Sequence, residues 1–198
     1  MPSVYIISGC NGAGKTTASY TVLPEMLKCD EFVNVDEIAK GLSPFNPDRA
    51  AIEAGRLMLA KMDKLIGLKV DFAFETTLSP RSYVNMVKKA KEAGYHVTLL
   101  FFWLNSVDLA IERVKTRVVE GGHDVAVPVI KRRYRAGLVN LFELYMPICD
   151  YWLIFDNSLP KADFIAEGYF NEVRNIKNNS IFASIKLKYH DYRQRKQD

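Results

Sequence analysis

A glycine-rich segment near the N-terminus, residues 9–16, has the sequence GCNGAGKT and fits the phosphate-binding pattern G-x-x-x-x-G-K-[ST]. An apolar, strand-like run precedes it and a helix-capable segment follows it, which is the context that the pattern requires. In such a loop, backbone N–H groups beside the glycines reach phosphate oxygens, the lysine places its charge against the β and γ phosphates, and the last hydroxyl binds Mg²⁺. The segment therefore predicts a site for ATP and Mg²⁺, with Thr16 as the metal ligand, Lys15 as a catalytic cation, and these residues around the nucleotide: Gly9, Asn11, Gly12, Ala13, Gly14, Lys15, Thr16 and Thr17.

A phosphate loop alone does not distinguish a GTPase, an ABC-type ATPase and a kinase. A GTPase of the usual kind needs an N-K-x-D motif that reads the base and a D-x-x-G switch, and neither string occurs. The L-S-G-G-Q motif and the acidic strand end of an ABC ATPase are also missing from the sequence. A small kinase, in which a basic lid closes over the phosphates, is the class that remains.

Asp36 follows a short apolar run, residues 32–35, that is typical of a strand. We expect it at the carboxyl end of that strand, the edge where ligands bind in open α/β sheets. A carboxylate placed there can orient an attacking hydroxyl and accept its proton, which makes Asp36 the candidate catalytic base and a substrate contact. The alternative is that Asp36 is the N-cap of the helix that follows, a role that its residue type also suits.

Glu75, Thr76 and Thr77 end the next strand-like run and reach the same edge of the sheet. One acid beside two hydroxyls favours contact with the substrate. Glu75 could instead belong to the hydration shell of Mg²⁺, or the three residues could be a polar strand end with Thr77 capping a turn.

A basic region covers residues 113–135. Arg113 and Arg117 lie one helical turn apart, and a loop that opens with Gly121 and Gly122 separates them from further basic residues. Guanidinium groups on two helices around such a loop suit a lid that neutralises charge on the transferring phosphoryl group. We predict this catalytic role for Arg117 and Arg133, although the neighbouring Arg132 leaves the second position ambiguous, and we expect a solvated helix face for the others: Lys115, Lys131 and Arg135.

The elements that must position these residues alternate along the 198-residue chain. Five short apolar runs, each followed by a helix-period segment, predict a parallel sheet covered on both faces; the runs are residues 4–7, 32–35, 70–75, 96–104 and 151–155. The prediction is one α/β domain over residues 1–198, with a lid at about 113–135 and a C-terminal extension at about 159–198. The pattern is weaker in the extension, where 163–176 could form a hairpin and 181–189 a strand or a helix.

Composition indicates the cellular location of the protein and the charge of its ligand. No apolar run approaches the roughly 20 residues that cross a bilayer, and the N-terminus has no secretory signal pattern, so we expect a cytoplasmic protein without a membrane partner. The three cysteines form no C-x-x-C pair and are expected to be free thiols. The net charge of +4 is concentrated in the lid and in the C-terminal residues, which agrees with an anionic ligand, whereas the basic tail is interpreted as solvated rather than as a nucleic-acid site.

Taken together, the spaced motifs resemble the zeta toxin family of small P-loop kinases. The motifs that carry the resemblance are GCNGAGKTT, NVDEIAKGLSP, FETTLS, ERVKTRVVEGGH, IKRRY and YWLIFDNS. The resemblance implies a three-layer, kinase-type P-loop fold with a five-stranded parallel sheet in the order 2-3-1-4-5. It also implies ATP-dependent phosphorylation of a hydroxyl on a small acceptor, most readily a nucleotide sugar such as UDP-N-acetylglucosamine, and a possible antitoxin partner. Two alternatives stay open: a polynucleotide 5′-hydroxyl kinase, and an ATP-binding interaction protein without catalysis.

Overall fold

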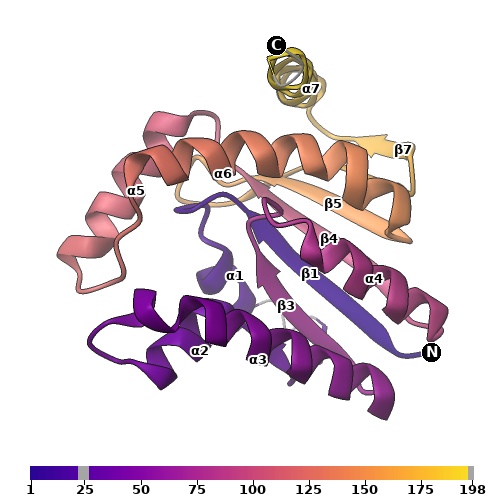
Figure 1. The fold of residues 1–198 in the computed structure, drawn as a ribbon. Coiled ribbons are helices and arrows are strands. Elements are labelled where there is room, and N and C mark those ends of the chain that lie inside the picture. The colour runs from indigo at the N-terminus through magenta and orange to yellow at the C-terminus, as the bar shows by residue number, and fades with distance from the viewer. Residues whose placement is uncertain (22–26, 196–198) are drawn as a thin grey trace.

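The structure is a computed structural model that describes residues 1–21 and 27–195. Its centre is a seven-stranded sheet in the order β2-β3-β1-β4-β5-β6-β7 (Figure 1). The strands are β1 (Ser3–Gly9), β2 (Phe32–Val33), β3 (Phe72–Thr76), β4 (His96–Trp103), β5 (Tyr151–Asp156), β6 (Asp163–Tyr169) and β7 (Glu172–Ile176). The α-helices are α1 (Lys15–Thr21), α2 (Val35–Leu42), α3 (Pro47–Leu68), α4 (Ser82–Glu92), α5 (Val107–Val119), α6 (Val127–Asn140) and α7 (Asn179–Gln194); a π-helical turn, η2 (Leu141–Tyr145), and a 3₁₀ turn, η3 (Met146–Ile148), follow α6.

The first five strands are parallel and have the predicted order 2-3-1-4-5. The prediction of a five-stranded, wholly parallel sheet is nevertheless wrong, because β6 and β7 add an antiparallel hairpin to β5. The hairpin suggested at 163–176 is therefore present, although its pairing with β5 was not predicted. Ile165 and Ala166 of β6 are fully buried, so this strand extends the core, whereas most of the edge strand β7 is exposed. The segment predicted as strand or helix is helical and lies in α7.

The second strand is shorter than predicted, and this moves Asp36. Strand β2 ends at Val33, and Asn34 is the N-cap of α2, with its Oδ1 accepting the backbone N–H groups of Asp36 and Glu37 at 2.8 and 3.4 Å. The position of Asp36 at a strand end and the alternative of Asp36 as a helix cap are therefore both wrong. Asn34 takes the capping role because an uncharged side-chain carbonyl at that position reaches both free N–H groups of the first turn.

Helices cover both faces of the sheet, as the alternating pattern requires (Figure 1). Along β1 and β4, neighbouring residues point to opposite faces. Ile6 and Leu99 belong to a core shared with α3, α4 and α7, whereas Ile7 and Leu100 belong to a core shared with α5 and the first half of α6. The sheet thus places the carboxyl ends of its parallel strands at one edge, where the loops after β1, β3 and β5 come together.

Within the described residues, no helix is both long and apolar enough to cross a bilayer.

Candidate active site

The glycine loop connects β1 to α1 and adopts a backbone that its glycines permit. Gly9, Gly12 and Gly14 have φ values of 147°, 77° and 76°, which L side chains rarely adopt. A Cβ at Gly14 would lie 2.6 Å from Asn157 Nδ2, and one at Gly12 would lie 2.9 Å from the carbonyl oxygen of Ala110. The side-chain amide of Asn157 also donates to the carbonyl of Ala13 at 2.8 Å. Asn157, which follows β5, and Ala110 of α5 therefore pack closely against the loop, and a side chain at Gly14 or Gly12 would collide with one of them.

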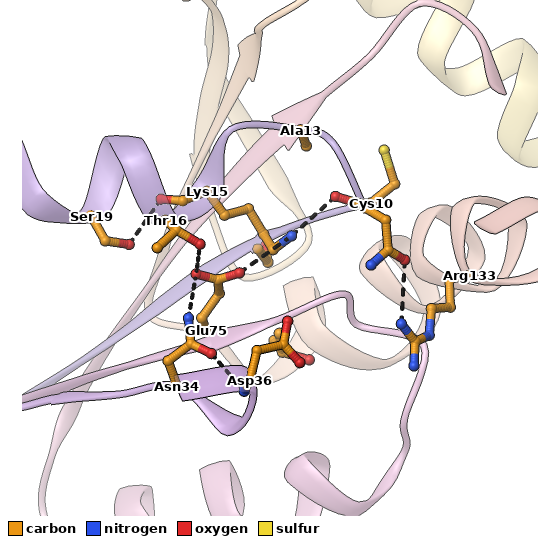
Figure 2. A network of polar contacts seen from close by, with 12 residues as sticks. Cys10, Ala13, Lys15, Thr16, Ser19, Asn34, Asp36, Glu75 and Arg133 are labelled. Carbon is orange, nitrogen blue, oxygen red and sulfur yellow. Dashed lines mark hydrogen bonds and ion pairs between the residues drawn. The ribbon is translucent and has the colours of Figure 1, made fainter. Parts of the chain in front are cut away.

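Glu75, at the end of β3, connects the loop to the rest of the sheet edge (Figure 2). Lys15 Nζ lies 3.4 Å from its Oε1, while the Thr16 hydroxyl and the Asn34 side-chain amide donate to its Oε2 at 2.8 and 3.0 Å. Lys15 also donates to the carbonyl of Cys10 at 3.0 Å. Lys15, Asn34 and Glu75 are all at most 9% exposed. These contacts bring together the cation and the hydroxyl of the loop around one buried carboxylate.

The oxygens of Thr16 and Glu75 form a donor set that suits Mg²⁺. This cation prefers hydroxyl, carboxylate, phosphate and water oxygens and usually keeps several of its waters. Among residues 1–21 and 27–195, no three His, Cys, Asp or Glu side chains cluster as metal ligands would, so the chain has no all-protein cage there. The residues fit a metal that is held mainly by nucleotide phosphates and water and anchored by Thr16, with Glu75 beside it.

A cavity of about 330 Å³ opens in front of the loop. Its wall contains most of the residues predicted as site residues; they are Asn11, Gly12, Gly14, Lys15, Thr16, Thr17, Asp36, Glu75, Thr76, Thr77, Arg117 and Arg133. Gly9 and Ala13 belong to the loop but do not line this cavity. The residues predicted to bind phosphate, to act as the base, to contact the acceptor and to form the lid therefore line one cavity.

Asp36 and Tyr83 lie on the acceptor side of this cavity. Asp36 is exposed in the first turn of α2, and its carboxylate points to the space between Glu75 and the loop (Figure 2). Burial raises the pKa of the Tyr83 phenol, and the negative charge of Asp36 raises it further. The phenol is anchored by its contact with Met58 Sδ at 3.3 Å.

Three arginines line the opposite wall of the cavity. Arg133 Nη1 donates to the side-chain oxygen of Asn11 in the loop at 3.4 Å, whereas its neighbour Arg132 is exposed. Arg117 donates to the carbonyl of His123 at 2.6 Å, and its Nε is buried without a hydrogen-bond partner. The geometry thus selects Arg133 from the doublet. The basic residues predicted to be solvated are exposed: Lys115, Lys131 and Arg135.

Two residues important to the geometry, Asn34 and Tyr83, were not predicted, and two others, Arg113 and Gly122, were placed in the lid without a role of their own. Arg113 donates to the carbonyls of Asn157 and Ser158 at 2.7 and 3.1 Å, and its position one helical turn before Arg117 was a signal for a shared face. Gly122 lets the lid loop fold over Arg117, because a Cβ there would lie 2.5 Å from Arg117 Cγ. Asn34 followed an apolar run directly before a helix, which is a cap signal, whereas nothing in the local sequence indicates the position of Tyr83.

Comparison with known proteins identifies the family. The family model described as Zeta toxin matches residues 1–145. The chain belongs to the Zeta toxin family. An uncharacterised protein of Haemophilus influenzae is 36% identical over 127 residues, which are 64% of this chain and 88% of that protein.

Solved structures share the fold of this Zeta toxin family member. A chain of the AvrRxo1-ORF1:-ORF2 complex with ATP aligns with a TM-score of 0.75 and 19% identity over 93% of this chain, which spans only 63% of that one. The PezAT toxin-antitoxin system of Streptococcus pneumoniae gives 0.62 and 16% over 97% of this chain and 87% of that one. A gluconokinase from Sinorhizobium meliloti gives 0.51 and 16% over 80% of this chain and 84% of that one. The family and the shared P-loop kinase fold support a kinase-type enzyme that uses a nucleotide.

Proposed function

We propose that the protein is an ATP-dependent kinase that phosphorylates a hydroxyl group of a small acceptor. The observation that carries this proposal is that one cavity is lined by the P-loop lysine, the side chain of Asp36 and three arginines. A nucleotide-binding protein without catalysis would need the P-loop, but it would need neither a carboxylate across the cavity nor a second wall of guanidinium groups.

The cations act on the phosphates. Lys15 binds the β and γ phosphates, and Arg117 and Arg133 stabilise the charge that develops on the transferring group. Arg113 holds the connection after β5 through two backbone carbonyls, which keeps Asn157 against the loop. Bound Mg²⁺ supplies further positive charge at the phosphates, with Thr16 as its protein ligand.

Asp36 acts on the acceptor. Its carboxylate accepts a hydrogen bond from the attacking hydroxyl and takes the proton as the oxygen bonds to the γ-phosphorus, while the bond from that phosphorus to the bridging oxygen breaks and ADP leaves. The cap that Asn34 forms on α2 fixes the backbone of Asp36, and Glu75 fixes Asn34 in turn. The base is therefore connected to the P-loop through two side chains.

The acceptor that we propose first is a nucleotide sugar, with UDP-N-acetylglucosamine as the candidate taken from the family. Thr76, Thr77 and Asp36 line the acceptor side and can bind sugar hydroxyls by donating and accepting hydrogen bonds. The carboxylates of Asp36 and Glu75 in the same wall repel the closely spaced phosphates of an oligonucleotide, which is the second candidate acceptor. We propose an antitoxin-like protein as a partner, since neighbours in fold come from the AvrRxo1-ORF1:-ORF2 complex and a toxin-antitoxin system.

The test uses purified protein with Mg²⁺-ATP and a metabolite extract, followed by mass spectrometry for a species heavier by one phosphate. UDP-N-acetylglucosamine and a 5′-hydroxyl oligonucleotide are then assayed separately. Asp36→Asn keeps the shape of the side chain and is expected to lower kcat about 10²- to 10⁴-fold with ATP affinity unchanged. Transfer to the oligonucleotide alone would replace the proposed acceptor, and tight ATP binding without transfer to any acceptor would refute the kinase.

A further inference from the structure

The segment after β3, residues 76–80, has an unusual backbone and is called the acceptor lip below. Thr76, Thr77 and Pro80 line the cavity, but Leu78 between them is fully buried and has a φ of 57°. Left-handed backbone at a branched, non-glycine residue costs on the order of 1 kcal/mol or more and persists only where surrounding contacts impose it. Something in the structure must therefore hold the lip in this shape.

The contacts that hold the lip come from α6 and η2. Asn140 Nδ2 donates to the carbonyls of Leu78 and Ser79 at 2.7 and 3.3 Å, and the Tyr145 hydroxyl donates to the carbonyl of Pro80 at 3.0 Å. On the cavity side, the Thr76 hydroxyl accepts the N–H of Leu78 at 3.1 Å. Asn140 is 3% exposed, and its hydrogen bond to the Leu78 carbonyl is buried. Three successive carbonyls of the lip are thus bound by two buried side chains.

Close packing of the α6 backbone against the lip adds to these hydrogen bonds. A Cβ at Gly137 would lie 2.4 Å from the carbonyl oxygen of Thr77, so a glycine is needed for α6 to approach the lip. Arg133, Gly137 and Asn140 are spaced i, i+4 and i+7 and therefore share one face of α6. The same face carries the arginine against the P-loop at one end and the support of the acceptor lip at the other.

We propose that Asn140 is a positioning residue for the acceptor: through the lip carbonyls it sets where Thr76 and Thr77 meet the substrate, and α6 fixes that position relative to Arg133. The proposal rests on the kinase function proposed above. The competing explanation is that Asn140 only satisfies buried carbonyls and contributes to stability alone. The two explanations differ in what Asn140→Leu does to the acceptor.

Asn140→Leu keeps the size of the side chain and removes the donor. Val139→Ala is the matched control, because Val139 is a buried neighbour on α6 whose side chain cannot form a hydrogen bond to the lip. Initial rates are measured with Mg²⁺-ATP and UDP-N-acetylglucosamine, each varied in turn. We expect Asn140→Leu to raise the KM for the acceptor about 10-fold, equivalent to the loss of one to two hydrogen bonds, with the KM for ATP within about 2-fold of the parent. Val139→Ala should leave both KM values unchanged.

Hydrogen exchange at the lip gives a readout that does not need activity. The Leu78 amide should exchange faster in Asn140→Leu than in Val139→Ala when the two variants have comparable melting temperatures. If Asn140→Leu has the same acceptor KM and the same Leu78 amide exchange rate as Val139→Ala, the positioning role is overturned. If the parent transfers no phosphate to any acceptor, the proposed function fails. The role of Asn140 in holding the lip is then tested by hydrogen exchange alone, and an exchange rate of the Leu78 amide equal to that in Val139→Ala would overturn it.

Discussion

Substitutions at the buried pair of Lys15 and Glu75 should affect ATP binding and protein stability in different ways. Lys15→Met removes the cation and keeps most of the side-chain stem. At 3.4 Å and an effective dielectric constant of about 20, the lost attraction is about 5 kcal/mol, most of which offsets the cost of burying both charges. Thr16 and Asn34 still donate to Glu75, so the net loss of stability is about 1 to 3 kcal/mol. For a chain of this length, that lowers Tm by about 2 to 12 °C.

The same substitution removes a charge-assisted hydrogen bond to the phosphates, so ATP should bind about 10- to 150-fold more weakly. Glu75→Gln in the Lys15→Met background removes the uncompensated charge and should recover most of the lost Tm, but it should not recover ATP binding. Differential scanning calorimetry and isothermal titration with Mg²⁺-ATP measure the two effects. A double variant as unstable as the sum of the two single variants would refute the coupling. ATP affinity equal to that of the parent in Lys15→Met would refute the P-loop assignment.

Two further predictions concern the lid and a thiol. Arg133→Ala should lower kcat about 10³-fold or more with little change in the Kd for ADP, whereas Arg132→Ala, its exposed neighbour, should change neither; equal losses would indicate a general basic surface. Burial raises the pKa of the Cys10 thiol from 9.0 to about 12. The unfolded chain then releases that proton above about pH 9 while the folded chain keeps it, so stability should fall as the pH rises from 9, and urea unfolding should show a smaller fall in Cys10→Ala.

The parallel part of the fold and the contents of the site follow largely from local sequence. Each of the first five strands is a continuous apolar run, and the carboxyl ends of parallel strands must share one edge, so the glycine loop and Glu75 could be placed together without coordinates. Arg133 could not be separated from Arg132 in this way, because the choice depends on how α6 is rotated about its axis. The packing of buried residues of α6, among them Ile130 and Tyr134, determines that rotation.

The hairpin that the sequence suggested at 163–176 is formed by β6 and β7, but its addition to the parallel sheet was not predicted. β7 is stabilised by its hydrogen bonds to β6 rather than by buried side chains, and a strand without a buried face leaves little pattern in the sequence. Asp36 was misplaced because the stretch FVNV continues the β-branched pattern through Val35, whereas the cap formed by Asn34 starts the helix before it. The acceptor lip, by contrast, depends on contacts with the distant residues Asn140 and Tyr145 and had no signal in FETTL itself.

Residues beyond the family match at 1–145 complete the support of this site. Helix α7 packs against α6, with the Tyr192 ring 6.4 Å from that of Tyr134 and Arg193 paired with Glu143 at 3.0 Å. Tyr134 directly follows Arg133, and its hydroxyl donates to the carbonyl of Leu104 at the end of β4. A shift of α6 would move the arginine and the acceptor lip together, since both are attached to one helix face. We therefore expect the C-terminal helix, which carries none of the site residues, to limit the movement of α6.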